Sequence, residues 1–155
     1  MSGNSKQCGE LLKISGKTFL IEFDLKGDEG GRLIAIENNK DIPFNINRVF
    51  FIFGTKKDVV RGQHANKLSK FVLVALSGSC IVKTYDGYKT NEYILDRPTK
   101  GLFIKNMVWK DMFAFSSDCI LLVLTDHFYD GDEYIRDIRI YDRLLKTAIH
   151  NNEVI

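Results

Sequence analysis

The sequence has little of what marks a membrane protein or a nucleic-acid-binding protein. No apolar run approaches the roughly 20 residues of a membrane-spanning helix, and a run such as Cys119–Leu124 is only as long as a strand. The formal net charge is +2, and the basic residues are scattered among acidic ones instead of forming the stripe that a nucleic-acid partner requires. We therefore expect neither a membrane nor a nucleic acid as a partner.

Cysteine is also scarce, with Cys8, Cys80 and Cys119 forming an odd, widely spaced set without a C-x-x-C motif. Such a set indicates reduced thiols, and it excludes a disulfide scaffold. The first ten residues, MSGNSKQCGE, lack the charged-then-apolar order of a signal peptide. These features predict a cytoplasmic protein.

The length of 155 residues, with 45% hydrophobic and 27% charged residues, predicts one globular domain. We expect residues 1–9 to be a flexible N-terminal lead-in and residues 10–155 to form a single domain. The richness in Phe, Ile, Val and Tyr favours β-structure.

Alternating apolar residues predict many short strands, the clearest being KTFLIEFDL near the N-terminus. Glycine- and aspartate-containing turns such as KGDEGGR and a central DG separate them. A helical repeat is present only over about 134–149. Many strands and one terminal helix predict a β-sandwich or barrel. The expected strands are 10–14, 17–25, 33–36, 46–53, 71–76, 80–85, 88–95, 102–104, 108–113 and 119–125.

The most chemically suggestive stretch is RGQHANKLSKFVLVALSG, residues 61–78. If it begins as a strand, His64 and Asn66 share one face, because side chains alternate with a period of two. On its own, a histidine in such a strand is usually a hydrogen-bonded core residue.

The positions of Gly62, His64, Asn66 and Gly78 resemble the first signature of the cupin superfamily, in which two histidines and a glutamate bind a metal. Here Asn66 replaces the second histidine, and Trp109 stands where the second signature would supply another. A divalent metal needs at least three protein ligands, so we expect no metal and no other cofactor. A histidine without a metal fits proton transfer near neutral pH.

A wider resemblance extends from about residue 20 to the terminal helix. The segments RGQHANK, LSGSCIV, PTKGLFI, MVWKDM, FSSDCILLVL and YDGDEYIRD occur in the order found in the sugar 3,4-ketoisomerases, the WxcM-like cupins. The resemblance implies a mainly β cupin β-jelly roll (double-stranded β-helix) with a short C-terminal helix. It also implies a homodimer with exchanged strands.

The implied reaction converts a dTDP-linked 4-keto-6-deoxyhexose to its 3-keto isomer through an enediolate, for 3-amino deoxysugars of surface polysaccharides such as the lipopolysaccharide O-antigen. This ketone shift requires a base, stabilisation of the enediolate oxygen and delivery of a proton to the neighbouring carbon, without a redox cofactor or metal. His64 corresponds to the first histidine of the family's H-A-H motif and is the expected base. Asn66 is expected to donate to the developing oxyanion or to orient a substrate hydroxyl.

The resemblance also indicates substrate-binding residues. Arg48 and Arg61 are expected to grip the diphosphate, since guanidinium matches phosphate oxygens, although both could be ordinary salt-bridging residues. Trp109 is expected to form a pocket wall. The remaining expected positions are Phe50, which is a tyrosine in many relatives, and Gly30 and Lys110, which the resemblance places near the sugar ring.

Two alternatives to ketoisomerisation stay open. The protein could be a nucleotide-sugar 3,5-epimerase, which uses the same base chemistry at other carbons. It could also be a non-catalytic cupin that binds the sugar nucleotide. We interpret YDGDEYIRD as an acidic turn into the last helix, and His127 and His150 as surface residues.

Overall fold

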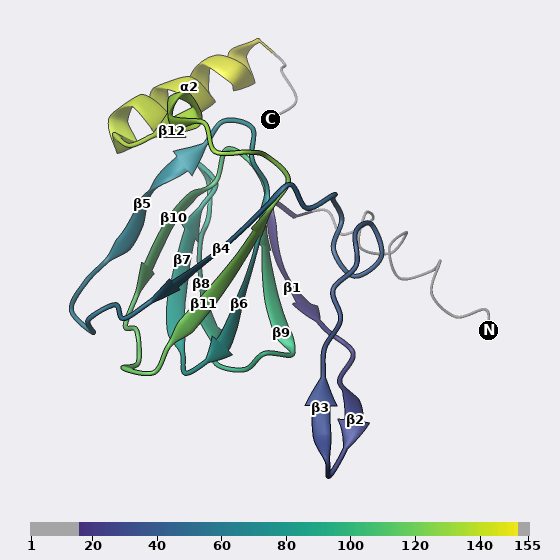
Figure 1. Cartoon of the computed structure of the whole chain (residues 1–155). Helices are drawn as coiled ribbons and strands as arrows, with labels where there is room; N and C mark the ends of the chain where they lie inside the picture. Colours follow the sequence, from purple (N-terminus) through teal and green to yellow (C-terminus); the bar gives the residue numbers. More distant parts are fainter. Residues whose placement is uncertain (1–15, 152–155) are drawn as a thin grey trace.

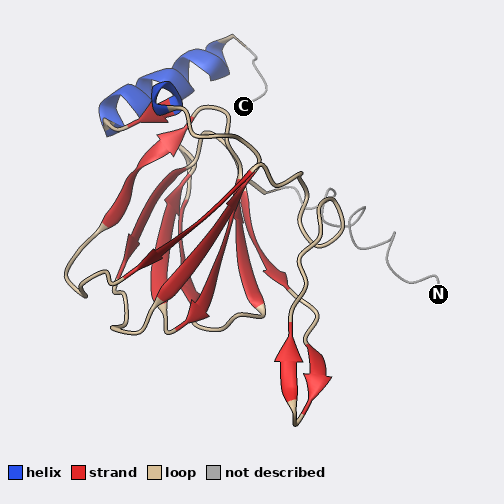
Figure 2. Ribbon diagram, viewed as in Figure 1, coloured by secondary structure: helices blue, strands red, loops and turns tan. Residues whose placement is uncertain are grey.

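The computed structural model describes residues 16–151, and these residues form two facing antiparallel β-sheets (Figures 1 and 2). The first sheet has the order β1 (Thr18–Glu22), β9 (Lys100–Ile104), β6 (Phe71–Ser77), β11 (Ile120–Thr125) and β4 (Arg48–Phe53). The second has the order β12 (Tyr134–Ile135), β5 (Arg61–Asn66), β10 (Trp109–Phe113), β7 (Cys80–Tyr85) and β8 (Thr90–Leu95). This mainly β architecture with one C-terminal helix confirms the predicted fold class.

The main core lies between the two sheets, where alternate strand residues point inward. In β4 the side chains of Arg48, Phe50 and Ile52 are partly buried, whereas Phe51 and Phe53 are exposed, because successive side chains of a strand point to opposite faces. Burying a large aliphatic or aromatic side chain contributes about 1.5–3 kcal/mol. The inner cluster is therefore the main source of stability. Its buried members include Leu73, Val82, Leu95, Leu102, Ile104, Val108, Phe115 and Leu121.

A second cluster covers the outer face of the first sheet. Ile42 and Phe44 are buried against this face, beside Val72 and Phe103, although they lie in a segment without regular strands. The expected strand at 33–36 is wrong apart from its first residue, because residues 34–36 form no ladder. Their alternating apolar side chains instead help to cover the sheet.

A two-stranded hairpin projects from the body of the molecule (Figure 1). It consists of β2 (Lys26–Asp28) and β3 (Gly31–Leu33) and corresponds to the predicted turn KGDEGGR. The backbone N–H of Gly30 donates to Asp28 Oδ1 at 2.8 Å and closes the tip. The expected lead-in at 1–9 and the expected strand at 10–14 lie outside the described residues.

The C-terminal helix α2 (Ile138–His150) packs across one end of the second sheet (Figure 1). It begins four residues later than predicted, because residues 131–133 form the 3₁₀ helix η1 and the next two pair with β5 as β12. Asp137 caps it, with its Oδ1 accepting from Arg139 N at 2.8 Å. Tyr141, Leu145 and Ala148 form its buried face.

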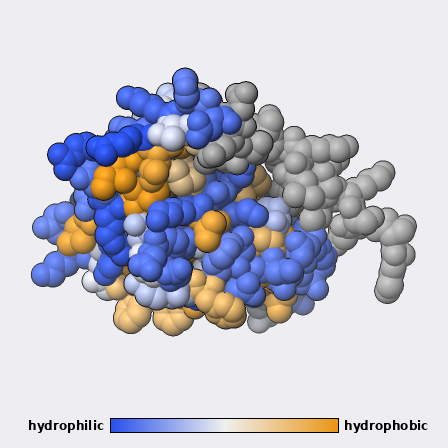
Figure 3. All heavy atoms as spheres, turned by 90° about the horizontal axis from the view of Figure 1, so that it is seen from above, coloured by the Kyte–Doolittle hydropathy of each residue, from blue (hydrophilic) through white to orange (hydrophobic). Residues whose placement is uncertain are grey.

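The surface around helix α2 is largely hydrophilic, with hydrophobic areas between the charged side chains (Figure 3). The helix contributes Ile138, Ile140 and Leu144, which are 40%, 48% and 39% exposed. In the part of the chain that the structure describes, no helix is long and apolar enough to cross a membrane.

Candidate active site

A β-bulge in β5 sets the position of His64. Gly62 and Gln63 both have positive φ, at 83° and 55°, and the pairing of β5 with β10 shifts register at this point. A Cβ on Gly62 would lie 2.6 Å from the carbonyl oxygen of Lys110, so the strands can approach only because residue 62 is glycine. Bulges of this kind redirect a side chain next to an active site.

The bulge also fixes the tautomer of His64. Its Nδ1 lies 2.9 Å from the carbonyl oxygen of Gly62, which can only accept, so Nδ1 carries the hydrogen and Nε2 keeps its lone pair. Burial, together with the charge of Lys110, lowers the pKa of His64 to about 4. At neutral pH the imidazole is therefore uncharged and can accept a proton.

His64 lines a cavity of about 320 Å³ between the two sheets. Lys110, the residue paired with His64 on β10, lines it too, as do Arg61 and Tyr134. The ring of Tyr134 lies 4.8 Å from that of His64. Phe50, Ile52, Phe71, Leu73, Met112 and Val123 complete the wall, which is therefore apolar apart from a few ionisable groups. This composition is typical of a small-molecule site.

A chain of hydrogen bonds runs behind the cavity wall. Lys110 Nζ donates to Asn66 Oδ1 at 2.7 Å, and Asn66 Nδ2 donates to Glu133 Oε1 at 3.1 Å. Glu133 also accepts from the Ser69 hydroxyl and from the backbone N–H groups of Leu68 and Ser69, the latter two at 3.1 and 2.9 Å. Asn66, Lys110 and Glu133 are only 1%, 4% and 4% exposed, so this is a buried, oriented polar network.

The network determines two pKa values. Burial lowers the pKa of Lys110 to about 7, although the negative charge of Glu133 acts in the opposite direction. Burial alone would raise the pKa of Glu133, but the hydrogen bonds from Ser69, Leu68 and Asn66 outweigh it and lower that pKa. Glu133 is therefore a carboxylate at neutral pH, while the lowered pKa of Lys110 lies close to neutral pH.

Arg48 lies beside the cavity, on the same face of β4 as Phe50. Its guanidinium carbon is 5.2 Å from the centre of the Phe50 ring and 5.5 Å from that of Tyr129. The Nε and Nη2 atoms are buried and have no hydrogen-bond partner among the described residues. An unpaired buried guanidinium is unfavourable, so its geometry suits the binding of an anion.

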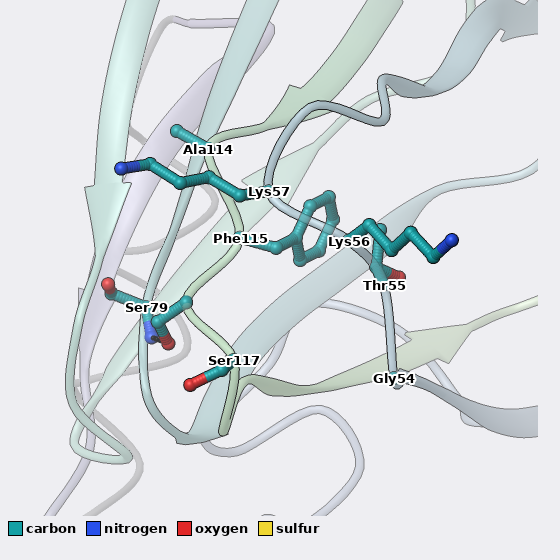
Figure 4. A pocket seen from close by; sticks show the side chains of 9 residues that line it. Gly54, Thr55, Lys56, Lys57, Ser79, Ala114, Phe115 and Ser117 are labelled. Atoms are coloured by element: carbon teal, nitrogen blue, oxygen red, sulfur yellow. Dashed lines mark hydrogen bonds between the residues drawn. The ribbon is translucent and has the colours of Figure 1, made fainter.

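A second, wider hollow of about 760 Å³ lies beyond the end of β4 (Figure 4). Its polar lining comes from hydroxyl groups and from the exposed Lys56 and Lys57, with Phe115 at its floor. Thr55 lines this hollow and Arg61 lines the cavity of His64, and the Thr55 hydroxyl accepts a hydrogen bond from Arg61 Nε at 3.0 Å. Since this hollow contains no group suited to proton abstraction, we place the reaction in the cavity of His64.

The structure brings most of the predicted site residues together. His64, Phe50, Arg61 and Lys110 line the cavity, Arg48 lies beside it, and Asn66 lies one step behind the wall. Asn66 does not take the expected position facing an oxyanion, because its amide is held between Lys110 and Glu133.

Trp109 and Gly30 do not reach the cavity. Trp109 points to the opposite face of β10, since it precedes the inward-facing Lys110, and its ring lies 5.8 Å from that of Tyr141 under helix α2. The expectation that it forms a pocket wall is therefore wrong within this chain. Gly30 lies at the tip of the projecting hairpin.

Glu133 and Tyr134 were not among the predicted site residues. Both belong to the segment interpreted as an acidic turn, yet Glu133 is buried and Tyr134 contacts His64. The sequence signal that could have identified them is the aromatic Tyr134 directly after the acidic residues. His127 forms a 2.8 Å contact with Asp126, and His150 is exposed at the helix end, away from the site.

Within residues 16–151, no cluster of three or more His, Cys, Asp or Glu side chains could hold a metal ion. The side chains around His64 include the cation Lys110, which pairs with it across the strands, and the ring of Tyr134, and these do not make a metal-binding set. The chemistry of the site therefore has to be derived from the side chains themselves.

Two antiparallel sheets that enclose a histidine-bearing cavity place the protein among the cupin-type jelly rolls. The chain belongs to the WxcM-like family, since the family described as "FdtA: WxcM-like, C-terminal" matches residues 16–146.

Three similar proteins are named as 3,4-oxoisomerases or 3,4-ketoisomerases. A TDP-4-oxo-6-deoxy-alpha-D-glucose-3,4-oxoisomerase from Aneurinibacillus thermoaerophilus is 46% identical over 127 residues, covering 82% of this chain and 89% of that protein. The crystal structure of a 3,4-ketoisomerase from Helicobacter canadensis is 43% identical with a TM-score of 0.81, over 83% of this chain and 97% of that one. The third is a histidine-to-asparagine mutant of the 3,4-ketoisomerase QdtA from Thermoanaerobacterium thermosaccharolyticum, in complex with TDP-4-keto-6-deoxyglucose. It is 37% identical with a TM-score of 0.82, over 84% of this chain and 95% of that one.

Proposed function

We propose that this protein is a TDP-sugar 3,4-ketoisomerase, which converts a TDP-4-keto-6-deoxyhexose to the 3-keto isomer without a metal. The observation that carries the proposal is the cavity in which a neutral His64, with a free Nε2, lies on the strand next to the buried cation Lys110. The names of the similar proteins supply the substrate class.

His64 acts as the base. Its Nε2 removes the proton from C3, which is acidic because it lies next to the C4 carbonyl, and the electron pair moves into an enediolate. The proton is then returned to C4, so that the ketone ends at C3. The hydrogen bond from Nδ1 to Gly62 stabilises the imidazolium that forms in between.

Cationic side chains give the cavity a field that suits a diphosphate. Arg61 lines it and is fixed through Nε by Thr55, while Arg48 presents unpaired nitrogens nearby. A guanidinium binds phosphate oxygens in a bidentate manner, and a charged hydrogen bond of this kind contributes about 1.5–3 kcal/mol. We propose that Arg48 and Arg61 bind the diphosphate.

We further propose a homodimer in the cytoplasm with exchanged strands, in which residues 10–155 act as one domain and the product enters 3-amino deoxysugar synthesis. The projecting hairpin supports the exchange, since it leaves the body of its own chain and could carry Gly30 to a second subunit. Light scattering of the wild type, and of a variant lacking residues 26–33, would measure the assembly. A monomeric wild type would contradict it.

The test of the function is proton NMR of TDP-4-keto-6-deoxyglucose incubated with the protein in deuterated water. We expect a 3-keto product, with deuterium at C4 in those turnovers in which the proton on His64 Nε2 exchanges with solvent before it is returned, and a rate lower by about 10²–10⁴-fold in His64→Asn. The matched control is His127→Asn, because that histidine lies outside the cavity and should leave the rate unchanged. Inversion at C5 would indicate an epimerase, and TDP binding without any conversion of the sugar would indicate a non-catalytic binding protein; either would refute the proposal.

A further inference from the structure

We propose that Lys110 is a second catalytic residue, whose amine carries a proton between the two substrate oxygens while His64 carries one between the two carbons. This inference rests on the proposed ketoisomerase function and deepens it. It assigns the task that a single imidazole leaves open, since the oxygens at C4 and C3 must also gain and lose a proton.

The first support is the position of Lys110. It pairs with His64 across β10 and β5, so both side chains leave the sheet on the same face as direct neighbours. Both line the same cavity. A substrate whose C3 faces Nε2 of His64 would therefore have its C4 oxygen on the side of Lys110.

The second support is that the ammonium group is held by a neutral partner. Lys110 Nζ donates to Asn66 Oδ1, and it forms no ion pair with a described carboxylate. The amide cannot turn round, because Asn66 Nδ2 is bonded to the anchored carboxylate of Glu133. One of three ammonium hydrogens is thus committed to positioning, and the others are available to a ligand.

The third support is the environment of the ammonium. Lys110 is 4% exposed, and its Nζ lies 4.4 Å from the centre of the Phe71 ring. The ionisable groups that face it are His64 from β5 and, through Asn66, Glu133 from η1; Phe71 from β6 and Thr84 from β7 are uncharged. Because burial outweighs the attraction of Glu133, the pKa of Lys110 falls to about 7, which suits a group that must both give and take a proton.

In the proposed reaction, each side chain gives back every proton that it takes up. As His64 Nε2 takes the C3 proton, the C3–H electron pair forms the C3=C4 double bond, and the C4 oxygen takes a proton from Lys110 Nζ to give an enediol. The neutral amine then takes the proton of the C3 hydroxyl, the C3 carbonyl forms, and C4 takes the proton from His64 Nε2. Both side chains return to their starting states.

The test compares Lys110→Met and Lys110→Arg with the wild type. Arginine keeps the positive charge but cannot give up its proton, so both variants should lower kcat by about 10²–10⁴-fold. The wild-type kcat should fall as the pH rises above about 7, because the acid form of Lys110 is lost. Lys83→Met is the matched control, since Lys83 lies exposed on the outer face of the same sheet and should leave kcat and its pH profile unchanged.

A measurement without substrate separates this inference from the function itself. In protein with ¹³C-labelled lysine, the signal absent from Lys110→Arg should titrate near pH 7 in the wild type. If the wild type isomerises the keto sugar and Lys110→Met retains more than about a third of kcat, the inference is wrong and the function stands. A wild type without isomerase activity overturns both, even if the titration near pH 7 is found.

Discussion

The buried amine of Lys110 makes the stability of the protein depend on pH in a way that can be calculated. Its pKa is lowered from the ordinary value of 10.5 to about 7 in the folded state. Between these values the unfolded chain binds more protons than the folded one, so the free energy of unfolding rises with pH. From pH 7 to pH 9 this contribution amounts to about 2 kcal/mol, since each unit of pKa difference corresponds to about 1.4 kcal/mol.

Lys110→Met removes this contribution. The difference in free energy of unfolding between the variant and the wild type should therefore shift by about 2 kcal/mol in favour of the wild type from pH 7 to pH 9, and little below pH 7. Urea denaturation at a series of pH values measures it, and taking the difference cancels groups common to both proteins. His64 titrates below this window, with its pKa lowered to about 4.

The control is again Lys83→Met, whose difference from the wild type should stay constant over the same pH range, because Lys83 is exposed. A difference for Lys110→Met that changes by less than about 0.5 kcal/mol would show that Lys110 titrates normally in the folded protein, and the reasoning about its burial would be wrong.

Three further substitutions test other parts of the account. Gly62→Ala should lower the free energy of unfolding by at least about 2 kcal/mol and should lower kcat at least tenfold. The reason is that the new Cβ would lie 2.6 Å from the Lys110 carbonyl oxygen and would displace His64. Wild-type kinetics would contradict this. Arg48→Met should raise the Kd for TDP about 10–100-fold in calorimetry without loss of stability, and an unchanged Kd would remove Arg48 from the diphosphate site. Tyr141→Phe should lower the free energy of unfolding by about 1–2 kcal/mol, measured in urea, because two carbonyl oxygens lose their hydroxyl donor; equal stability would argue against that role.

The fold could be predicted largely from the sequence, because alternation is a local signal. The strand predicted over 46–53 is present as β4, and residues 61–66 form the strand that places His64 and Asn66 on one face. The segment 34–36 misled the prediction for a physical reason. Its apolar alternation is real, but the side chains cover an existing sheet instead of joining a ladder.

The candidate site was harder to predict, because its key contacts join distant segments. The roles of Asn66 and Glu133 depend on a hydrogen bond across 67 positions, which no local pattern reveals. Trp109 was assigned to the pocket from a resemblance, but strand alternation alone would have separated it from Lys110. The acidic residues of YDGDEYIRD indicated a turn exposed to solvent. In the structure, however, three hydrogen-bond donors from residues 68–69 stabilise the buried carboxylate of Glu133.

The most direct test of the central claim is a crystal structure of the His64→Asn variant soaked with TDP-4-keto-6-deoxyglucose. We expect the hexose in the cavity of residue 64, with C3 facing that side chain, the C4 oxygen within hydrogen-bond distance of Lys110 Nζ and the diphosphate on Arg48 and Arg61. A sugar bound instead in the hollow lined by Lys56, Lys57 and Phe115, or one with C3 and C4 turned away from residues 64 and 110, would contradict the account.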